Sequence, residues 1–460
     1  MKKDEIKKIY AELKDYADKS VTLYGWVRSV RASKDFGFID MTDGTCFKTA
    51  QVVFTKGGDF DFDAVSKLTT GSTIKVEGSV FLTPENKQPF EIKATNVEIL
   101  SRTDETYPLQ KKRHTVEFLR QIAYLRPRTN LFSAIYRVRS EAAFAFHDFF
   151  HKNGFVYVHT PILTSSDCEG GSDLFRVTTH NFYAGGEPIK PEDDYFGKPV
   201  YLTPTGQLEG EAMASAFTKI YTFGPTFRSE NSNTTRHASE FWMIEPEVYF
   251  ADLEDIMDLE EAVIKYVIRH IFDTCPDEMN MFNSFVDTGL IDRLNNVLNS
   301  EFARVTYTDA IEILKKNNDK FEYKVEWGSD IQTEHERYLA ETVYKRPVFV
   351  TDYPKEIKAF YMKQNPDGKT VRACDLLAPG VGEITGGSQR EEDYDKLVAR
   401  MHELGLKEKD YDWYLNLRKF GTATHSGFGI GFERILMYIT GVSNIRDVAL
   451  FARTPKNCEF

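Results

Sequence analysis

Long apolar runs are absent from this 460-residue sequence, and none approaches the roughly 20 residues that a membrane-spanning helix needs. The first residues, Met1 to Glu5, lack the apolar core of a signal peptide. Hydrophobic residues make up 41% and charged residues 28% of the chain, which is ordinary for a globular enzyme. We therefore expect a cytoplasmic protein with no membrane partner.

Several familiar chemical patterns are also missing. The five cysteines include no CxxC pair, which favours a reducing setting and mostly structural thiols. Gly368-Lys369-Thr370 resembles half of a phosphate-binding P-loop, but the glycine that should precede it is replaced by Lys363. His147 and His151 share a helical face without a third ligand nearby in the sequence, so a zinc site is not predicted.

Positive charge is in deficit overall, because the formal net charge is −12. Residues 106–139 are the exception, with eight basic residues against Glu117 alone, a net of +7. A local basic belt is what contact with nucleic-acid phosphates requires, whatever the total charge. A solvated connector with salt-bridged arginines is the alternative, since a charge count cannot show which side chains converge.

The first hundred residues have the pattern of a small β-barrel. A charged helix is expected at 4–18, and period-two alternation predicts strands at 21–31, 36–41, 47–54, 73–82 and 90–100. A short helix at 62–68 interrupts the strands. Five strands with one helical insert suit an OB-fold, a barrel that commonly binds oligonucleotides, although another small barrel fits the same pattern. We assign residues 1–102 to this domain and 103–130 to a basic hinge.

Residues 131–460 have the pattern of a second, α+β domain. Helical periodicity predicts helices at 133–153 and 252–272, and 155–158 and 348–351 are expected to be strands. The strands are spaced too irregularly for βαβ repeats. Residues 276–345 are expected to form a mostly helical insertion, and 181–199, rich in Gly, Pro and Asp, a surface loop that covers a site.

Residues 227–247 carry the strongest functional signal. Two apolar stretches, 220–227 and 241–250, flank a polar loop, and their ends hold Arg228, Glu230, Arg236, His237, Glu240 and Glu245. A buried strand pair has no need of these charges. Arginine offers a planar fork to phosphate oxygens, and carboxylates hold that fork or a metal. The segment therefore predicts a site for a polyanionic ligand, with Phe241 as a flat face for a base.

Two further segments fit such a ligand. Glycines alternate in residues 427–434 up to Arg434, a pattern that allows close packing where a strand meets a helix. Asp375 and Glu383 flank a Pro-Gly-x-Gly turn, so two adjacent strands could present both carboxylates to Mg²⁺. The alternative for this pair is two unrelated exposed acids.

These segments resemble the class II aminoacyl-tRNA synthetases. Residues 228–237, Arg-Ser-Glu-Asn-Ser-Asn-Thr-Thr-Arg-His, resemble motif 2 of the asparaginyl members of the aspartyl/asparaginyl subgroup, and residues 427–434 resemble motif 3. The resemblance runs over nearly the whole chain, with departures at residues 169–173 (Glu-Gly-Gly-Ser-Asp) and 450–453 (Leu-Phe-Ala-Arg). It implies an N-terminal OB-fold followed by a catalytic domain built on an antiparallel sheet flanked by helices.

The resemblance also implies the reaction and its residues. ATP would activate asparagine to asparaginyl-AMP, and the product would be transferred to the terminal adenosine of tRNA(Asn). Arg228 and Arg434 would be catalytic. ATP would be bound by Arg228, Glu230, Arg236, His237, Phe241, Glu383 and Arg434, and Mg²⁺ by Asp375 and Glu383. The amino acid would be bound by Glu169, Gln207, Glu211, Glu245 and Arg390, with Arg390 on the side-chain carbonyl and Glu211 on its amide.

By the same resemblance, the barrel would read the anticodon through Arg28, Phe38 and Gln51, and the chain would form a homodimer through the helix at 133–153 and Pro161. Phe38 could equally be a core residue of the barrel, and Glu211 a structural polar group. An aspartyl-tRNA synthetase, including one that charges both tRNAs, is the main alternative. The related aspartyl enzymes carry a lysine in the stretch 207–211, and this sequence has none. A tRNA-independent amide-forming enzyme and an inactive tRNA-binding module are further alternatives.

Overall fold

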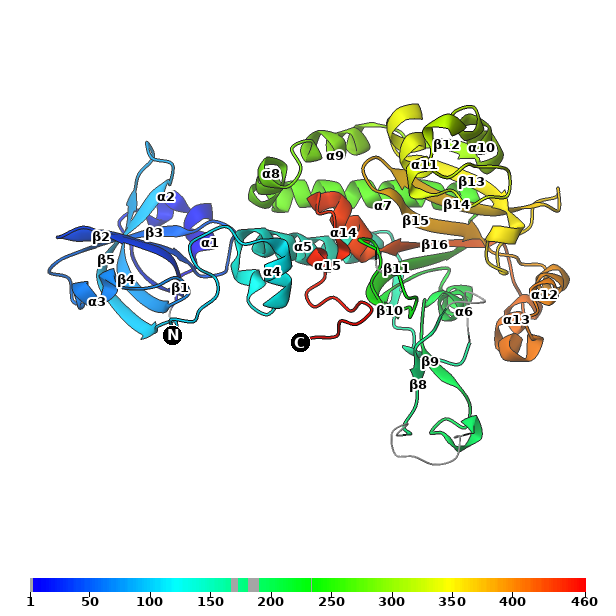
Figure 1. Ribbon diagram of the computed structural model, residues 1–460, viewed down its shortest axis with the longest axis horizontal. Helices are drawn as coiled ribbons and strands as arrows, with labels where there is room; N and C mark the ends of the chain where they lie inside the picture. The colour runs from blue at the N-terminus through cyan, green and yellow to red at the C-terminus, as the bar shows by residue number, and fades with distance from the viewer. Residues whose placement is uncertain (1–2, 167–172, 181–189, 233) are drawn as a thin grey trace. The chain divides into compact units, whose positions relative to one another are not determined.

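The computed structural model describes residues 3–166, 173–180, 190–232 and 234–460, which divide into two compact units, 1–134 and 135–460 (Figure 1). The division falls within helix α5 (Asn130–Lys152), so the predicted boundaries at 102 and 130 remain a prediction. Among the described residues, none of the helices combines the length and the apolar character that crossing a membrane requires.

The first unit contains a closed five-stranded barrel, as the OB-fold prediction requires. Its strands are β1 (Ser20–Ala32), β2 (Phe36–Thr42), β3 (Ala50–Thr55), β4 (Thr73–Leu82) and β5 (Phe90–Ser101), paired in the order β1-β2-β3-β5-β4. Alternate residues of each strand are buried, which is the period-two pattern that identified them. Helix α3 (Phe62–Ser66) lies between β3 and β4 in sequence, and α1 (Ile6–Ala11) and α2 (Leu13–Tyr16) precede the barrel.

The basic connector belongs to the first unit, and its positive charges are not all on the surface. Helix α4 (Val116–Gln121) and a 3₁₀ turn (Arg126–Arg128) form its ordered part. Arg126 is buried, with its guanidinium 4.4 Å from the ring centre of Phe132. Arg139 lies in the second unit and pairs with Glu433 at 2.8 Å. Arg126 and Arg139 therefore have structural contacts, as the alternative of a connector with paired arginines expects, and contact of the basic stretch with nucleic acid stays a prediction.

The second unit is built on an eight-stranded sheet. Its order is β12-β13-β14-β15-β16-β11-β10-β6, and its strands are β12 (Ala303–Thr306), β13 (Val348–Pro354), β14 (Thr370–Ala378), β15 (Gly382–Gln389), β16 (His425–Gly431), β11 (Glu240–Tyr249), β10 (Lys219–Phe227) and β6 (Val156–Val158). The interior pairs are antiparallel, as predicted, but both edge strands, β12 and β6, pair parallel to their neighbours. The sheet is therefore mixed rather than purely antiparallel.

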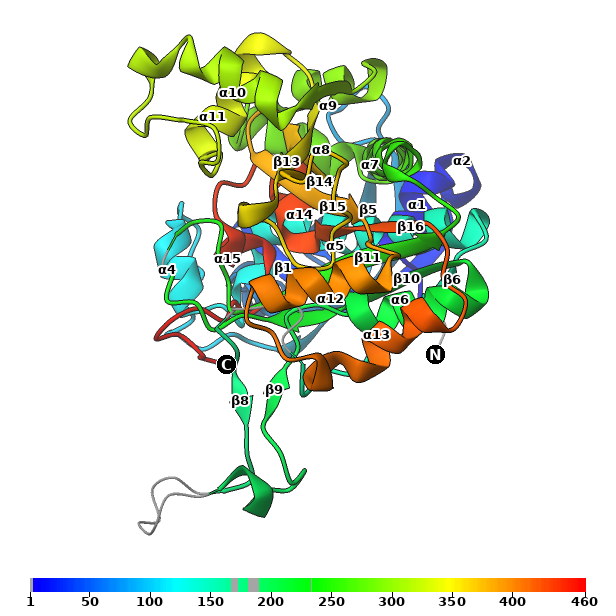
Figure 2. The same cartoon turned by 90° about the vertical axis from the view of Figure 1, so that its right-hand side faces the viewer.

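Helices flank this sheet (Figure 2). Helix α6 (Gln207–Phe217) packs against β10 and β11, and α7 (Leu253–Thr274) packs against β14, β15 and β16. Helix α14 (Phe432–Thr440) begins where β16 ends. The ring of Phe150 on α5 stacks on the ring of Tyr221 on β10, with the ring centres 4.6 Å apart, and this contact holds the helix on the strand.

The remaining elements lie in segments between these. Residues 276–345 contain α8 (Pro276–Phe285), α9 (Leu290–Asn299), α10 (Tyr307–Lys315), α11 (Thr333–Arg337) and the edge strand β12. A small sheet of β7 (Leu163–Thr164), β9 (Val200–Leu202) and β8 (Arg176–Val177) precedes α6. Helices α12 (Tyr394–Glu403) and α13 (Asp412–Lys419) precede β16, and α15 (Ile445–Val448) follows α14. Part of the predicted loop 181–199, namely 181–189, lies outside the described residues.

Candidate active site

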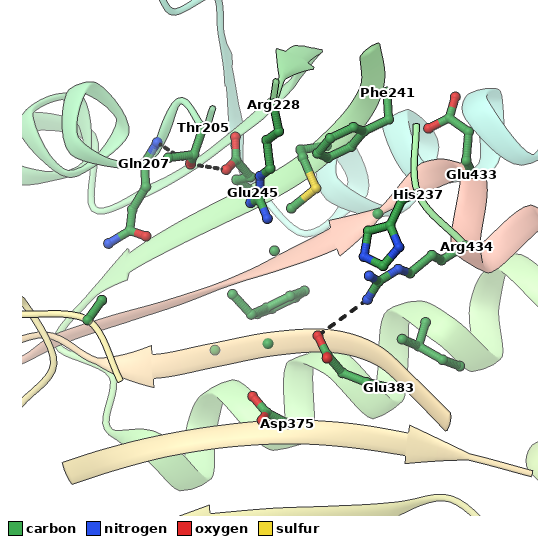
Figure 3. A pocket seen from close by; sticks show the side chains of 18 of the residues that line it. Thr205, Gln207, Arg228, His237, Phe241, Glu245, Asp375, Glu383, Glu433 and Arg434 are labelled. Atoms are coloured by element: carbon green, nitrogen blue, oxygen red, sulfur yellow. Dashed lines mark hydrogen bonds and ion pairs between the residues drawn. The ribbon is translucent and has the colours of Figure 1, made fainter. Parts of the chain in front are cut away.

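One cavity of about 360 Å³ in the second unit gathers most of the predicted site residues. Figure 3 shows them entering it from β11, from β14 and β15, and from the start of α14. The predicted residues that line it are Gln207, Arg228, Glu230, Arg236, His237, Phe241, Glu245, Asp375, Glu383, Arg390 and Arg434. Glu211 does not line it, and Glu169 lies outside the described residues. The charged groups therefore converge on a shared space.

The β10–β11 hairpin places the aromatic face and the first arginine. Its register pairs Thr226 with Phe241, and the Arg228 amide donates to the Ser239 carbonyl at 3.0 Å. The Arg228 guanidinium carbon is 5.5 Å from the ring centre of Phe241, a cation–π arrangement. The strand pair thus presents a cation and a flat ring side by side at the cavity wall.

His237 lies farther along the same loop. Its Nδ1 is 3.2 Å from the hydroxyl of Ser232 and 2.5 Å from that of Thr234. Burial lowers the pKa of His237, and the nearby charge of Arg434 lowers it further. A neutral ring is therefore favoured near neutral pH, suited to hydrogen bonding rather than to charge neutralisation.

Arg434 and Arg236 bring two cations to one end of the cavity. The Nη1 of Arg434 is 3.6 Å from Oε1 of Glu383, and the Nη1 of Arg236 is 3.9 Å from Oε2 of Glu336. Burial and the charge of Glu383 raise the pKa of Glu336 to about 7. This end therefore holds two arginines and closely spaced carboxylates, a mixture suited to phosphates and a cation.

Asp375 and Glu383 lie on the neighbouring strands β14 and β15, as the predicted turn requires. Gly386 leaves room between them, because a Cβ there would lie 3.3 Å from Oδ1 of Asp375 and 3.9 Å from Oε1 of Glu383. Among the described residues, no group of three His, Cys, Asp or Glu side chains could hold a metal. Two carboxylates suit Mg²⁺ that completes its shell with phosphates and water.

Sequence reasoning missed Lys358, whose Nζ lies 2.9 and 2.7 Å from the two Asp375 oxygens.

Glu245 provides a fixed anion at the opposite end. Its oxygens accept from the Thr205 hydroxyl, the Gly206 amide at 2.9 Å and the Thr222 hydroxyl at 3.0 Å. The side chain is buried yet lines the cavity. Gln207, at the first turn of α6, lies on the same wall. A carboxylate and an amide oxygen in these positions are suitable acceptors for an ammonium group.

Arg390 is held by a residue that the sequence interpretation did not select. Its Nη2 and Nε donate to Glu247 at 2.5 and 3.2 Å, and its Nη1 donates to Ser388 at 2.6 Å. Burial raises the pKa of Glu247 to about 7, against the opposing charge of Arg390. Period-two spacing from Glu245 was the signal that could have found Glu247, since alternate strand residues share a face.

Glu211 lies one layer behind the cavity wall. Both of its oxygens accept the Tyr414 hydroxyl at 2.9 Å, Oε2 also contacts Arg418 at 2.8 Å and His425 at 3.0 Å, and Oε1 accepts from Gln207 at 3.2 Å. Its predicted contact with a substrate amide remains a prediction. Arg418 and Tyr414, on α13, were not predicted from the sequence.

Comparison with known proteins agrees with this geometry. Residues 115–455 match the family described as class II tRNA synthetases (D, K and N), and residues 21–100 match an OB-fold nucleic acid binding domain. The chain is 59% identical to an asparagine–tRNA ligase of Alkaliphilus oremlandii over all of both chains, and 60% identical to one of Clostridium botulinum over 99% of each. A crystal structure of Pyrococcus horikoshii asparaginyl-tRNA synthetase with asparaginyl-adenylate is similar at 35% identity, full coverage of both chains and a TM-score of 0.88.

The fold, the cavity and the matched family define a class II tRNA synthetase, and the chain belongs to that family. Within it, the full-length identities of 59% and 60% place the chain among the asparagine–tRNA ligases. The family predicted from residues 228–237 and 427–434 is thereby confirmed, and so is the predicted activity.

Proposed function

We propose that this single cavity carries out both steps of asparagine–tRNA ligation with the residues that line it. The observation that carries the proposal is their convergence. Arg434 and Glu383 lie toward one end, Glu245 and Gln207 lie toward the other, and Arg228 lies beside Glu245 (Figure 3), with Asp375 and Arg390 on the same cavity wall. One end suits a triphosphate and the other an amino acid, so the reacting groups would meet between them.

In the first step, the asparagine carboxylate attacks the α-phosphorus of ATP and pyrophosphate leaves. Both reactants are anionic, so the cavity must offset their repulsion while holding them in line. Arg228 would bind the α-phosphate and Arg434 the γ-phosphate. Phe241 would stack on the adenine beside the Arg228 guanidinium. Glu230, Arg236 and His237 would orient the nucleotide, and no protein nucleophile is required.

Asp375 and Glu383 would hold Mg²⁺ next to these phosphates. When bound, the ion would reduce the negative charge that builds up on the leaving pyrophosphate. Lys358 holds Asp375 through both carboxylate oxygens, and the charge of Asp375 raises the pKa of Lys358 despite its burial. We infer that Lys358 keeps the Asp375 carboxylate in a fixed orientation.

At the other end, Glu245 and Gln207 would accept the α-ammonium group, together with Glu169. Arg390 would donate to the side-chain carbonyl of asparagine, and Glu211 would favour its amide. In the second step, the terminal adenosine hydroxyl of tRNA(Asn) attacks the carbonyl carbon of the mixed anhydride and AMP leaves.

All four cysteines in the described part of the chain are free thiols, which suits the cytoplasmic location we propose.

We propose that the barrel of the first unit binds the anticodon. The Gln51 amide donates to Glu91 at 2.6 Å, and the Phe38 ring is half-buried, 5.6 Å from that of Phe36. Arg28 is tied to the connector through the Arg128 carbonyl at 2.5 Å. Half-exposed aromatic rings beside polar groups are suited to stacking and reading unpaired bases.

We also propose a homodimer. Exposed apolar side chains lie on the segment that the resemblance assigned to the interface. They are Phe144 on α5, Val156 and Tyr157 on β6, and Ile162 and Leu163 after Pro161. Several exposed apolar side chains on one segment are typical of protein–protein contacts.

The proposed roles are tested by asparagine-dependent exchange of pyrophosphate into ATP. Arg228→Ala should reduce exchange by about a thousandfold or more, as expected when a charge contact to the transition state is lost. Arg269→Ala, on the surface of α7, is the matched control and should retain activity. Near-normal exchange in Arg228→Ala would refute the assignment of Arg228 to the α-phosphate.

A further inference from the structure

A buried cage of donors surrounds Glu211 directly behind the amino-acid end of the cavity. Its carboxylate and the Arg418 guanidinium form an ion pair at 2.8 Å with both side chains fully buried. Tyr414, from the same helix α13, donates its hydroxyl to both carboxylate oxygens at 2.9 Å. His425, at the start of β16, contacts Oε2 at 3.0 Å. None of these three partners has a role in the chemistry described above.

The two oxygens of Glu211 face different ways. Oε2 receives the Arg418 and His425 contacts, and neither of these residues lines the cavity. Oε1 accepts from Nε2 of Gln207 at 3.2 Å and lies 3.9 Å from Nε of Arg390. Gln207 and Arg390 both line the cavity. The cage therefore turns one oxygen of Glu211 toward the pair of residues that would meet the side chain and amino group of the substrate.

The cage also sets the charge of that oxygen. Burial alone would raise the pKa of Glu211, but the charge of Arg418 and the hydrogen bond from His425 hold it well below its usual range. The other charged groups around it are Arg390 and Glu247, already paired with each other. Tyr249 stacks on the His425 ring at 4.5 Å. An ionised carboxylate can accept hydrogen bonds but cannot donate one. Beside Arg390, Glu211 therefore acts only as an acceptor.

We propose that Arg418 is a specificity-determining positioning residue, which fixes Glu211 as an ionised acceptor so that the pocket prefers an amide to a carboxylate side chain. When one oxygen of the substrate side chain binds Arg390, the second group of that side chain points toward Oε1 of Glu211 and toward Gln207. The amide N–H of asparagine can donate a hydrogen bond to Oε1. The second carboxylate oxygen of aspartate would instead lie beside the negative charge of Glu211, which opposes binding. The inference rests on the proposed placement of asparagine against Arg390.

Pyrophosphate exchange with asparagine and with aspartate, without tRNA, tests the proposal on the full-length enzyme. Arg418→Met should raise the KM for asparagine at least tenfold, reduce the preference for asparagine over aspartate by a similar factor, and leave the KM for ATP unchanged. Arg418→Lys restores the charge and should recover part of the preference. Glu211→Gln should lose the preference for asparagine over aspartate to the same extent as Arg418→Met. The double variant should show no greater loss of this preference than either single variant.

A pH series separates this role from a purely structural one. Without its cation, the buried Glu211 should take up a proton in Arg418→Met, and raising the pH should then lower the KM for asparagine again. The profile of Glu211→Gln should not show this recovery. Arg400→Met is the matched control, because Arg400 is a buried arginine of α12 that bonds the Lys355 carbonyl at 2.6 Å, and its preference should equal that of wild type.

The outcomes are decisive. If the active variants keep the wild-type preference, or if the double variant shows the product of the two single losses, the proposal is wrong. Should Arg418→Met fail to fold, Glu211→Gln and Arg418→Lys carry the test, and unchanged preference in both would overturn it. Wild-type enzyme without asparagine-dependent exchange would instead refute the proposed function of the cavity, which is a different result.

Discussion

Arg390 and Glu247 form a buried two-point ion pair, with Nη2 to Oε1 at 2.5 Å and Nε to Oε2 at 3.2 Å. The pair occupies one edge of the guanidinium, and Ser388 accepts from Nη1. The charge of Arg390 is thus largely compensated before any substrate binds. A neutral carbonyl can still accept one of the remaining N–H groups without bringing a second anion beside Glu247.

This pair predicts a combined effect on stability and binding. Glu247→Ala should lower the free energy of unfolding by about 3 kcal/mol, because it leaves a buried charge without its partner. It should also weaken asparagine-dependent exchange at least tenfold. Thermal unfolding and exchange kinetics measure the two effects. Glu254→Ala, which removes the exposed partner of Arg372, is the matched control and should cost less than about 1 kcal/mol. Equal effects in the two variants would contradict the prediction.

Arg434 is predicted to act on ATP rather than on the amino acid. It lies in the first turn of α14, 3.6 Å from Glu383, at the end of the cavity that we propose for the phosphates. Arg434→Ala should therefore lower kcat/KM for ATP by about a hundredfold or more, the size expected for losing one charged contact to the transferring group. The KM for asparagine should change little. Kinetics with each substrate varied in turn measure this, and an effect confined to the asparagine KM would reassign the residue.

Glu260 predicts how stability depends on pH. It is fully buried on α7, where it bonds the Thr385 hydroxyl and lies 3.5 Å from the Cys374 thiol. Burial raises its pKa from 4.5 to about 8. The folded state then holds a proton that the unfolded chain has lost, so stability should fall as pH rises from about 4.5 to about 8. The loss is at most about 1.4 kcal/mol per pH unit.

Glu260→Gln keeps a hydrogen-bonding side chain but cannot ionise, so it should flatten this dependence. Thermal midpoints measured between pH 5 and 8 would show the difference. Some slope should remain, because the pKa values of Glu247 and Glu336 are also raised by burial, each to about 7. Glu261→Gln, the next residue on the helix and the partner of Lys265, serves as the control. An unchanged slope in Glu260→Gln would count against a buried neutral carboxyl.

The barrel and the central sheet could be predicted because their patterns are local. Alternation marked the strands of the barrel to within one residue at each end. The exception is β3, which begins at Ala50 rather than at 47. The parallel pairing of β12 and β6 could not be predicted, because strand direction depends on contacts far apart in sequence. The burial of Arg126 against Phe132 could not be predicted either, because a count of charged residues does not show which of them pack inside the protein.

The site was predictable where its chemistry lies within continuous segments. Arg228, Asp375, Glu383 and Arg434 each belong to a recognisable stretch and do line one cavity. Lys358, Arg418 and Tyr414 belong to no such stretch. Their relevance comes from hydrogen bonds to Asp375 and Glu211, which are 17, 207 and 203 residues away. Partners of this kind become visible only after folding.

The proposed dimer predicts a change in mass. Phe144→Asp places a charge on an apolar residue of α5 that is 61% exposed, so it should disfavour burial against a second subunit. Light scattering should give about twice the 52.9 kDa chain mass for wild type and a larger monomer fraction for the variant. Phe285→Asp, at an 82% exposed residue of α8, is the matched control and should remain dimeric. A monomeric wild type would rule out the proposed interface.

Gln51 should separate tRNA recognition from amino-acid activation. It lies on β3 and donates its amide to Glu91 on the neighbouring strand β5 at 2.6 Å. Gln51→Ala removes a group able to bond a base edge and leaves the Glu91 carboxylate without that donor, so it should oppose the approach of an anionic RNA. Asparagine-dependent exchange should be unchanged, because it needs no tRNA and we place it in the cavity of the second unit.

Charging of tRNA by Gln51→Ala should fall about tenfold, the loss expected when one base contact worth roughly 1–3 kcal/mol is removed. Asn96→Ala is a close control, since Asn96 also lies on the barrel and donates to a glutamate, Glu77, at 3.2 Å. That variant should charge tRNA normally if the effect is specific to the face around Gln51. Equal losses in the two variants would point to general weakening of the barrel, and a parallel fall in exchange would contradict anticodon binding by Gln51.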